Sequence, residues 1–363
     1  MSRVITFGEI MGRMAPPGFL RFRQTLPGKL DVIFAGAEAS VAASIAYMGE
    51  NAAFVTALPD HAIGDACVAS LKAMGVDTRF IQRTKKGRLG LYFLETGANQ
   101  RPSNVIYDRD GSSVSITSAE KYPWKDIFNG ADWLHVSGIT LAISKIAAQA
   151  AIAAAREAKS HNVRVSCDLN FRRKLWSWES GISPRELAEK TMRQILPFVD
   201  VVIGNEEDAA EVLGIHAKDT DVSSGKLAID KYPDVARKVV AQFPNVSSVA
   251  ITLRESISAS HNNWGAMLYT ASEDSACFAP MKDGKYQSYA ITHIVDRVGG
   301  GDAFAAGLIF AMLQPELSSP QRVISYAVAA SCLAHSIHGD FNFSSRSEVE
   351  SLMGGSGSGR VVR

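Results

Sequence analysis

The residues best suited to chemistry are three consecutive glycines and an aspartate, Gly299-Gly300-Gly301-Asp302. They follow an apolar, strand-like run at 289–295 and open an apolar segment at 303–313 that predicts a helix. A backbone without Cβ atoms can turn tightly and bring several N–H groups against a ligand. The start of a helix adds unpaired N–H donors and a positive dipole end. The sequence therefore predicts an anion-binding site with a carboxylate inside it.

Asp302 is the candidate general base of that site. Transfer of a phosphoryl group to a hydroxyl requires an anion cradle and a proton acceptor at one point, and this stretch supplies both. The alternative is a glycine turn followed by an aspartate that caps an ordinary helix, because acidic residues favour the first helical turn. The local pattern alone fits both interpretations.

Other polar groups fall where buried strands are expected to end. They are Asp168-Leu169-Asn170-Phe171-Arg172, Asn205-Glu206-Glu207-Asp208 and Thr252-Leu253-Arg254-Glu255. Ligands of open α/β sheets bind beyond the carboxyl ends of the strands. A capped helix or a solvated loop explains any one of these segments. Their shared position at strand ends, together with the glycine stretch, favours a functional site.

Strand-like and helix-like segments alternate along most of the chain, which predicts a parallel sheet covered by helices on both faces. The expected strands lie at 1–8, 52–58, 133–136, 163–168, 201–203 and 249–253, with antiparallel runs near 267–270 and 276–278. The expected helices lie at 36–48, 62–74, 144–161, 184–196, 206–213, 228–242, 303–313, 321–336 and 347–353. Two excursions rich in short strands, about 9–35 and 88–110, predict a separate small sheet. Residues 354–363 are rich in glycine and serine, which predicts a flexible tail.

The composition is that of one large globular domain rather than a fibrous or membrane protein. The chain has 363 residues, of which 46% are hydrophobic and 21% charged,. A net charge of +1 indicates neither nucleic acid nor a membrane surface as a partner,. Cys67, Cys167, Cys277 and Cys332 are far apart, as in a cytoplasmic protein with reduced thiols,. No secretory leader or membrane-spanning run is expected.

Several other kinds of active site are excluded by missing motifs. The chain has no P-loop, no His-Glu-x-x-His and no cysteine–histidine cluster with metal-binding spacing,. The early Gly8-Glu9-Ile10-Met11-Gly12 is not a dinucleotide-binding fingerprint,. This counts against a nicotinamide-dependent oxidoreductase.

Over nearly its whole length the chain resembles the PfkB family of ribokinase-like carbohydrate kinases. The residues that match the family's signatures in order and spacing are Gly8-Glu9, Gly36-Ala37-Glu38-Ala39, Asn205-Glu206-Glu207-Asp208 and Gly299-Gly300-Gly301-Asp302. Within the family the chain is most similar to bacterial 2-keto-3-deoxygluconate kinases. This similarity rests on five segments, which begin at His135, Asp168, Thr252, Asp296 and Gly339. Two of them are Asp168-Leu169-Asn170-Phe171-Arg172-Arg173-Lys174-Leu175-Trp176 and Gly339-Asp340-Phe341-Asn342.

The resemblance implies an α/β, three-layer α/β/α ribokinase-like domain over residues 1–353. Its small β-sheet lid would come from about 9–35 and 88–110, and lids of this family commonly pair into a dimer. The implied reaction transfers the γ-phosphoryl group of ATP to the 6-hydroxyl of 2-keto-3-deoxygluconate. Asp302 would take the hydroxyl proton, and backbone N–H groups of Gly299, Gly300 and Gly301 would stabilise charge on the phosphoryl group. Mg²⁺ would bridge the nucleotide phosphates.

The resemblance also assigns residues to the two substrates. Asn205 and Arg254 would lie on the nucleotide side with Gly299 and Gly301. Asp208 stands where the family often has a glutamate near the metal, so the charge is kept and its reach is shorter. The expected contacts of the sugar acid are Gly36, Tyr92, Tyr107, Arg109, Arg172 and Asp340. Adenine would be held by shape and backbone near residues 327–330, because the asparagine of many relatives is absent there.

Four alternatives remain open at this stage. Arg109 and Arg172 could be surface arginines paired with acids such as Asp108 and Asp110, instead of ligands of a carboxylate. The substrate could be a neutral sugar of the fructose or ribose type, or the protein could be a sugar-acid sensor without activity. The lid could be fully solvated instead of forming a homo-oligomer, although a small sheet with one apolar face leaves that face wet.

Overall fold

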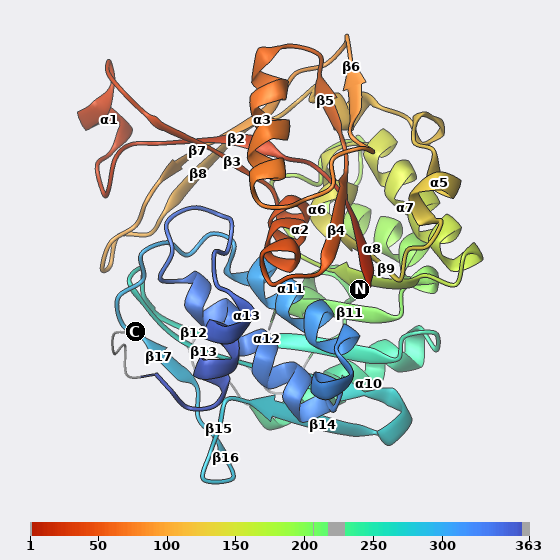
Figure 1. The fold of residues 1–363 in the computed structure, drawn as a ribbon, viewed down its shortest axis with the longest axis vertical. Coiled ribbons are helices and arrows are strands. Elements are labelled where there is room, and N and C mark those ends of the chain that lie inside the picture. The colour runs from red at the N-terminus through yellow and green to blue at the C-terminus, as the bar shows by residue number, and fades with distance from the viewer. Residues whose placement is uncertain (1, 206, 217–228, 358–363) are drawn as a thin grey trace.

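The computed structural model describes residues 2–205, 207–216 and 229–357 (Figure 1). Its largest sheet has nine strands, in the order β14-β13-β12-β11-β10-β9-β1-β4, with β17 paired to β13. Neighbouring strands from β4 to β12 are parallel, and β13, β14 and β17 pair antiparallel. The bounds are β1 Arg3–Phe7, β4 Asn51–Val55, β9 Trp133–Ser137, β10 Arg164–Asp168, β11 Val201–Asn205, β12 Ser248–Ser258, β13 His261–Thr270, β14 Ser275–Ala279 and β17 Tyr289–Ile291.

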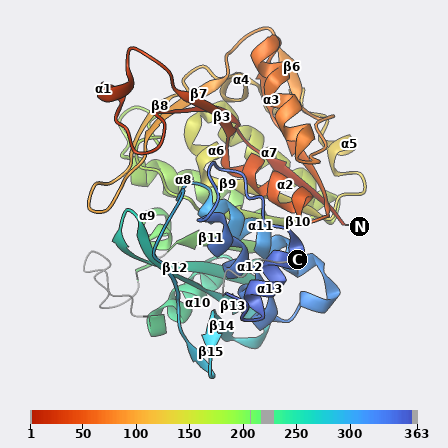
Figure 2. The same ribbon diagram turned by 60° about the vertical axis from the view of Figure 1, so that its left-hand side comes forward.

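Helices cover both faces of this sheet, as Figures 1 and 2 show. One layer contains α7 (Lys145–Ser160), α8 (Pro184–Ile195), α9 (Asp208–Leu213) and α10 (Tyr232–Gln242). The other contains α2 (Ala37–Tyr47), α3 (Ala62–Ala73), α11 (Gly300–Leu313), α12 (Pro320–Ala334) and α13 (Arg346–Met353). A separate hydrophobic core fills the space between the sheet and each layer. The predicted three-layer α/β/α fold is thus confirmed.

A second sheet of four strands lies apart from the main one, at the upper left of Figure 1. Its order is β3-β2-β7-β8, with β2 at Met11–Ala15, β3 at Asp31–Ala35, β7 at Gly90–Glu95 and β8 at Asn104–Asp108. Strands β2 and β7 run parallel, and the outer pairs are antiparallel. The four strands come from the two strand-rich excursions, and we call them the small sheet. Its inner face carries Met11, Ala15, Ala35, Tyr92 and Leu94, which form a third apolar cluster.

The remaining elements are short. They are α1 Phe22–Thr25, β5 Ala57–Pro59, β6 Gln82–Thr84, α4 Ser113–Ile116, α5 Trp124–Phe128, α6 Gly138–Ile143, the hairpin β15 Met281–Lys282 and β16 Lys285–Tyr286, and the 3₁₀ turns Ala119–Lys121, Leu196–Phe198, Ile229–Lys231, Ala271–Glu273 and Pro315–Leu317. In the part of the chain that the structure describes, no helix is long and apolar enough to cross a membrane.

Several predicted boundaries were wrong. The single strand expected at 52–58 is interrupted at Thr56, and the strand expected at 289–295 stops at Ile291. Helix α6 was not predicted, and residues 9–35 contain the short helix α1. The helix expected from 303 begins at Gly300, which places Asp302 inside its first turn. Glu206, residue 228 and positions 358–363 of the predicted tail lie outside the described residues.

Candidate active site

Helix α11 begins at the glycine stretch, and two of the three glycines are required by packing. Gly299 caps the helix with φ 85° and ψ −6°, a left-handed conformation that favours glycine,. A Cβ on Gly299 would lie 2.5 Å from the carbonyl oxygen of Asp340. A Cβ on Gly300 would lie 2.9 Å from Cε1 of His335. Both positions therefore need glycine whether or not a ligand binds.

Gly301 is different. Its φ is outside the left-handed region, and a Cβ built on it meets no atom of the described residues within 4 Å. The residue is exposed and borders the cavity described below. Since neither strain nor packing accounts for glycine here, the open space in front of its backbone is the feature that a bound anion would use.

We expect Gly301→Ala to lower turnover by on the order of 10- to 100-fold, because a Cβ would push a bound phosphoryl group off the N–H cradle. The melting temperature should stay the same or rise, since alanine stabilises a helix by about 1 kcal/mol relative to glycine. Gly299→Ala is the matched comparison and should destabilise the fold. Steady-state kinetics and thermal melts of both variants make the measurement. A stable Gly301→Ala enzyme with full activity would reduce the stretch to a structural turn.

The Asp302 carboxyl group lies in this first turn, partly buried beside the cavity. Burial raises the pKa of Asp302 to about 7, and the negative charge of Asp340 adds to the rise. The positive charge of Arg172 acts in the opposite direction and lowers the pKa. A carboxyl group with a pKa near neutrality is matched to accept a proton at physiological pH.

The cavity has a volume of about 310 Å³ and lies at the carboxyl ends of the central strands. It extends from the glycine stretch to the small sheet. It brings together the predicted residues Gly36, Tyr92, Tyr107, Arg109, Arg172, Asn205, Asp208, Arg254, Gly299, Gly300, Gly301, Asp302 and Asp340. Segments that are far apart in the sequence thus meet at one cavity, as expected for ligand sites of open α/β sheets.

Asp208 holds the ends of two neighbouring strands together. Its Oδ2 accepts a hydrogen bond from the Asn205 N–H at 2.9 Å, and its Oδ1 accepts one from the Phe171 N–H at 3.0 Å. Asn205 Oδ1 in turn accepts from the N–H groups of Glu207 and Asp208. Both carboxylate oxygens of Asp208 are therefore engaged by backbone, although each can still accept from a second donor.

Asp168 and Asn170 were quoted from the sequence without a role, and both border the cavity at the end of β10. Burial, followed by the charges of Asp208 and Asp302, raises the pKa of Asp168 well above its usual range. Arg172 counteracts this rise, as it does for Asp302. The Arg172 side chain is exposed and lies in the field of all three carboxyl groups. Arg172, which was expected among the contacts of the sugar acid, therefore lies close enough to Asp302 for its charge to act on that carboxyl group.

The cavity is also lined by residues that sequence reasoning missed. They are Asn262, Trp264, Arg297 and His335, which join the predicted Arg254. Arg297 donates to Asn262 Oδ1 at 3.0 Å, and burial together with the charge of Arg254 lowers the Arg297 pKa. The only available signal was the nearness of Arg297 to the glycine stretch. Arg254 of β12 and Arg297 of the loop before α11 thus bring two guanidinium groups to one cavity, and such a pair suits a polyanion,.

Residues 327–330, which were expected to shape the adenine site, do not border this cavity. All four are fully buried in α12. A Cβ on Gly307 of α11 would lie 3.0 Å from both Ala327 and Ala330. Their small side chains therefore let α12 pack closely on α11, and the expectation that adenine binds near these residues stays a prediction.

The small sheet contributes Tyr92, Tyr107 and Arg109 to the cavity. Arg109 is 6% exposed, forms an ion pair with Glu9 and lies over the ring of Tyr107 at 5.6 Å. Asp108 pairs instead with Arg88. The alternative that Arg109 is a surface residue paired with Asp108 or Asp110 was therefore wrong, and the buried Glu9 is a partner that the sequence did not indicate.

Gly36 borders the cavity, but packing against the chain at Glu9 already requires glycine at this position. A Cβ there would lie 2.1 Å from the carbonyl oxygen of Glu9. The close approach of the chain at Glu9 therefore excludes any larger residue at position 36. Packing thus requires glycine here independently of a ligand, and the contact of Gly36 with the sugar acid stays a prediction.

The assembled groups can activate a hydroxyl and stabilise a transferring anion. Asp302 supplies a proton acceptor, and the N-terminus of α11 supplies backbone donors and a positive dipole end,. Arg172, Arg254 and Arg297 supply positive charge around the same cavity. This set matches phosphoryl transfer, in which positioning and electrostatic stabilisation supply most of the catalysis.

Comparison with known proteins agrees with this chemistry. A family model described as pfkB family carbohydrate kinase matches residues 1–345. The crystal structure of 2-dehydro-3-deoxygluconokinase from Thermotoga maritima is 42% identical, with a TM-score of 0.86 over 98% of this chain and 100% of that one. A PfkB family carbohydrate kinase from Listeria grayi is 31% identical, with a TM-score of 0.84 over 97% and 100%. The 2-dehydro-3-deoxygalactonokinase of Haloferax volcanii is 28% identical over 99% of this chain and 98% of its own.

Proposed function

Because the chain belongs to the pfkB family of carbohydrate kinases, we propose that it transfers the γ-phosphoryl group of ATP to the 6-hydroxyl of 2-keto-3-deoxygluconate (2-dehydro-3-deoxygluconate). The chain is a carbohydrate kinase, and the sugar acid, the hydroxyl and the nucleotide are the parts proposed here. The observation that supports an acidic substrate is the buried Arg109, which follows a strand of the small sheet and lines the cavity. The name of the Thermotoga relative supports the same class of substrate.

The residues present fit ATP and Mg²⁺. Arg254, Arg297 and the open backbone at Gly301 match a polyphosphate, and Asn205 borders the same half of the cavity. Mg²⁺ in such sites keeps several waters and needs only one or two carboxylates. Asp208 and Asp168 are the carboxyl groups that would hold Mg²⁺, since each Asp208 oxygen keeps a lone pair beside its one backbone N–H donor,. Bound Mg²⁺ would supply charge neutralisation on the phosphates.

The chain's own residues would then act in defined places. Asp302 takes the proton from the 6-hydroxyl as its oxygen attacks. Backbone N–H groups at the start of α11, among Gly299, Gly300 and Gly301, stabilise charge on the transferring group. We assign Arg172 to the transferring phosphoryl group as well, instead of to the sugar acid, because its charge acts on Asp302. At the other end, Tyr92, Tyr107, Arg109 and Asp340 orient the sugar acid.

The test is a panel of substrates with ATP and Mg²⁺, in which ADP release and the position of the new phosphate are measured. We expect 2-keto-3-deoxygluconate to have the highest kcat/KM and to become phosphorylated at the 6-hydroxyl. The galactonate epimer belongs in the panel because of the Haloferax relative. Higher kcat/KM with fructose or ribose would replace the proposal by a neutral-sugar kinase, and absence of any turnover would favour a sensor.

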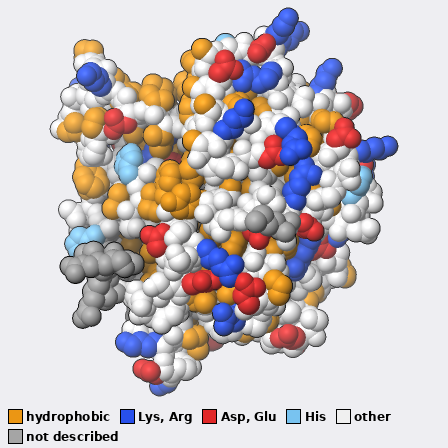
Figure 3. Space-filling view, in the orientation of Figure 1, with side chains coloured by type: hydrophobic (Ala, Val, Ile, Leu, Met, Phe, Trp, Pro, Cys, Tyr) orange, Lys and Arg blue, Asp and Glu red, His pale blue; other side chains and the backbone are white. Residues whose placement is uncertain are grey.

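We further propose that the small sheet is a lid over the sugar and that two lids pair in a homodimer. Val32, Met14, Phe93 and Ile106 are register neighbours in a row across all four strands, on the face away from the cavity. Val32 is 59% exposed and Ile106 49%. Hydrophobic side chains gather over this arm of the molecule in Figure 3. An exposed apolar row on an isolated sheet favours a partner surface of the same kind.

We expect the protein to sediment as a dimer or larger and the double variant Val32→Lys/Ile106→Lys to sediment as a monomer, because four buried charges would oppose the interface. Ile63→Lys/Ile257→Lys is the control, since these isoleucines are equally exposed, at 57% and 59%, and lie outside the small sheet. Analytical ultracentrifugation gives the masses. A wild-type monomer, or a dimer unaffected by the lid substitutions, would contradict lid pairing.

A further inference from the structure

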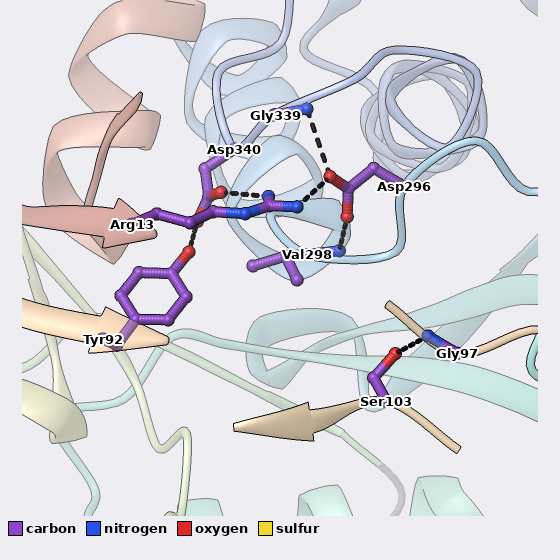
Figure 4. Close-up of polar contacts among 8 residues, drawn as sticks. All are labelled: Arg13, Tyr92, Gly97, Ser103, Asp296, Val298, Gly339 and Asp340. Carbon is purple, nitrogen blue, oxygen red and sulfur yellow. Dashed lines mark hydrogen bonds and ion pairs between the residues drawn. The ribbon is translucent and has the colours of Figure 1, made fainter. Parts of the chain in front are cut away.

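A single buried arginine connects the small sheet to the glycine stretch. Arg13 lies in the middle of β2 and is 1% exposed. Its Nη1 donates to Asp340 Oδ1 at 2.7 Å, and its Nη2 donates to Asp296 Oδ2 at 2.6 Å. Figure 4 shows the guanidinium group between the two carboxylates. The neighbouring strand adds Tyr92, whose hydroxyl donates to the other oxygen of Asp340 at 2.8 Å.

Both carboxylates belong to the loops that shape the start of α11. Asp296 accepts hydrogen bonds from the N–H groups of Val298 at 3.1 Å and Gly339 at 3.2 Å, so it joins the two loops directly. The Asp340 carbonyl oxygen packs against Gly299, where a Cβ would meet it at 2.5 Å. The Arg13 guanidinium group therefore contacts the two segments on which the position of the N–H donors depends.

Apolar packing reinforces the same connection. Val298, two residues after Asp296, packs against the inner-face cluster of the small sheet. That cluster contains Met11 and Ala15, which flank Arg13 on the same face of β2 because side chains alternate along a strand,. The loop before α11 thus contacts the small sheet through one ion-paired group and one apolar side chain.

The stability of the fold alone does not explain the ion pairs of Arg13 with Asp296 and Asp340. Buried ion pairs return little net stability compared with well-packed apolar residues, because both charges lose their hydration. What a planar guanidinium group adds is a fixed geometry between two carboxylates. In this protein the guanidinium group fixes the position of the small sheet relative to the two loops.

We propose that Arg13 is a positioning residue, which couples the seating of the small sheet over the sugar to the placement of the N–H cradle and Asp302. The inference rests on the proposed function, in which the sugar binds beneath the small sheet and the phosphoryl group at the cradle. Binding of the sugar would order residues 296–302 through Arg13, so phosphoryl transfer would be fast only when the acceptor is present.

The kinetic test compares Arg13→Met with Arg88→Met. Arg88 is a matched control because it also pairs with an aspartate of the small sheet, Asp108, at 2.7 Å, but lies at the surface away from the cavity. We expect Arg13→Met to lose on the order of 10²-fold in kcat/KM for the sugar, since small misplacements of reacting groups have effects of this size. Nucleotide affinity without sugar should change less than threefold. Arg13→Lys should recover part of the loss, because a point charge reaches the carboxylates without the planar fork.

Hydrogen exchange gives a second measurement that does not depend on the stability of Arg13→Met. In the wild-type protein, saturating sugar without nucleotide should slow exchange at the amides of residues 298–302, and Arg13→Lys should lose most of this response. The coupling is overturned if sugar leaves these amides unchanged in the wild type, or if Arg13→Met is folded with kcat/KM equal to that of Arg88→Met. Failure of the proposed function looks different, because the wild type would then phosphorylate another sugar, with which the same comparison is made.

Discussion

Asp302→Asn should lower kcat by about 10²–10⁴-fold, the usual contribution of a general base. Asparagine has nearly the same shape and keeps the first turn of α11, but it cannot accept the proton of the attacking hydroxyl. Nucleotide affinity should change little, because Arg254 and Arg297 lie elsewhere in the cavity and the N–H donors of α11 are backbone groups. Steady-state and single-turnover kinetics, with nucleotide binding measured separately, make the test.

The pH profile is the control for this variant. Burial raises the pKa of Asp302 to about 7, so the group is protonated and inactive as a base below that pH. The kcat/KM of the wild type should therefore rise as pH increases through about 7 and level off above it. The remaining activity of Asp302→Asn should lack this step. A folded Asn variant with near-normal turnover, or with the same pH step, would remove Asp302 from the role of base.

The glycine stretch and Asp302 could be predicted because the required residues are adjacent in the chain. Backbone freedom, helix start and carboxylate all lie between Gly299 and Asp302, so the local pattern contains the whole argument. The strand-end segments were predictable for a related reason, since parallel strands bring their carboxyl ends to one edge of the sheet. Both parts of the site can be located from the local sequence pattern and from the alternation of strands and helices.

The ion pairs of the small sheet could not be predicted in this way. Arg13 is separated by 283 residues from Asp296 and by 327 from Asp340, and an arginine in a short alternating strand is usually solvated. Glu9 was recognised only as part of a signature, although it neutralises Arg109 from 100 residues away. Burial of a charge depends on which elements meet in three dimensions, and no single segment of the sequence carries that information.

The pairing of Arg109 with Glu9 bears on the recognition of an acid. The Arg109 Nε donates to Glu9 Oε2 at 2.7 Å, and the paired side chains are 5% and 3% exposed. Glu9 fixes the guanidinium group, but it also balances the charge. A substrate carboxylate would therefore be recognised mainly by the directed N–H donors that remain, and less by net positive charge.

We expect Arg109→Met to lower kcat/KM for the sugar acid by about 10- to 100-fold through a higher KM, since a charge-assisted hydrogen bond contributes about 1.5–3 kcal/mol. The KM for ATP should change much less, because Arg109 lies at the small-sheet end of the cavity. Arg109→Lys should rescue only part of the loss, since an ammonium group cannot copy the planar fork.

The decisive comparison is between the acid and an analogue without the carboxylate. Arg109→Met should reduce kcat/KM strongly for the acid and only slightly for the analogue, which already lacks the contact. Arg109→Met alone leaves the Glu9 charge buried without a partner, which lowers stability. The double variant Glu9→Gln/Arg109→Met removes that charge, so it separates recognition of the substrate carboxylate from the loss of stability. If the double variant loses the preference for the acid while its melting temperature recovers, Arg109 acts on the substrate. An equal loss on both compounds, restored together with stability by Glu9→Gln, would instead make the pair structural and leave the acid substrate supported by similarity alone.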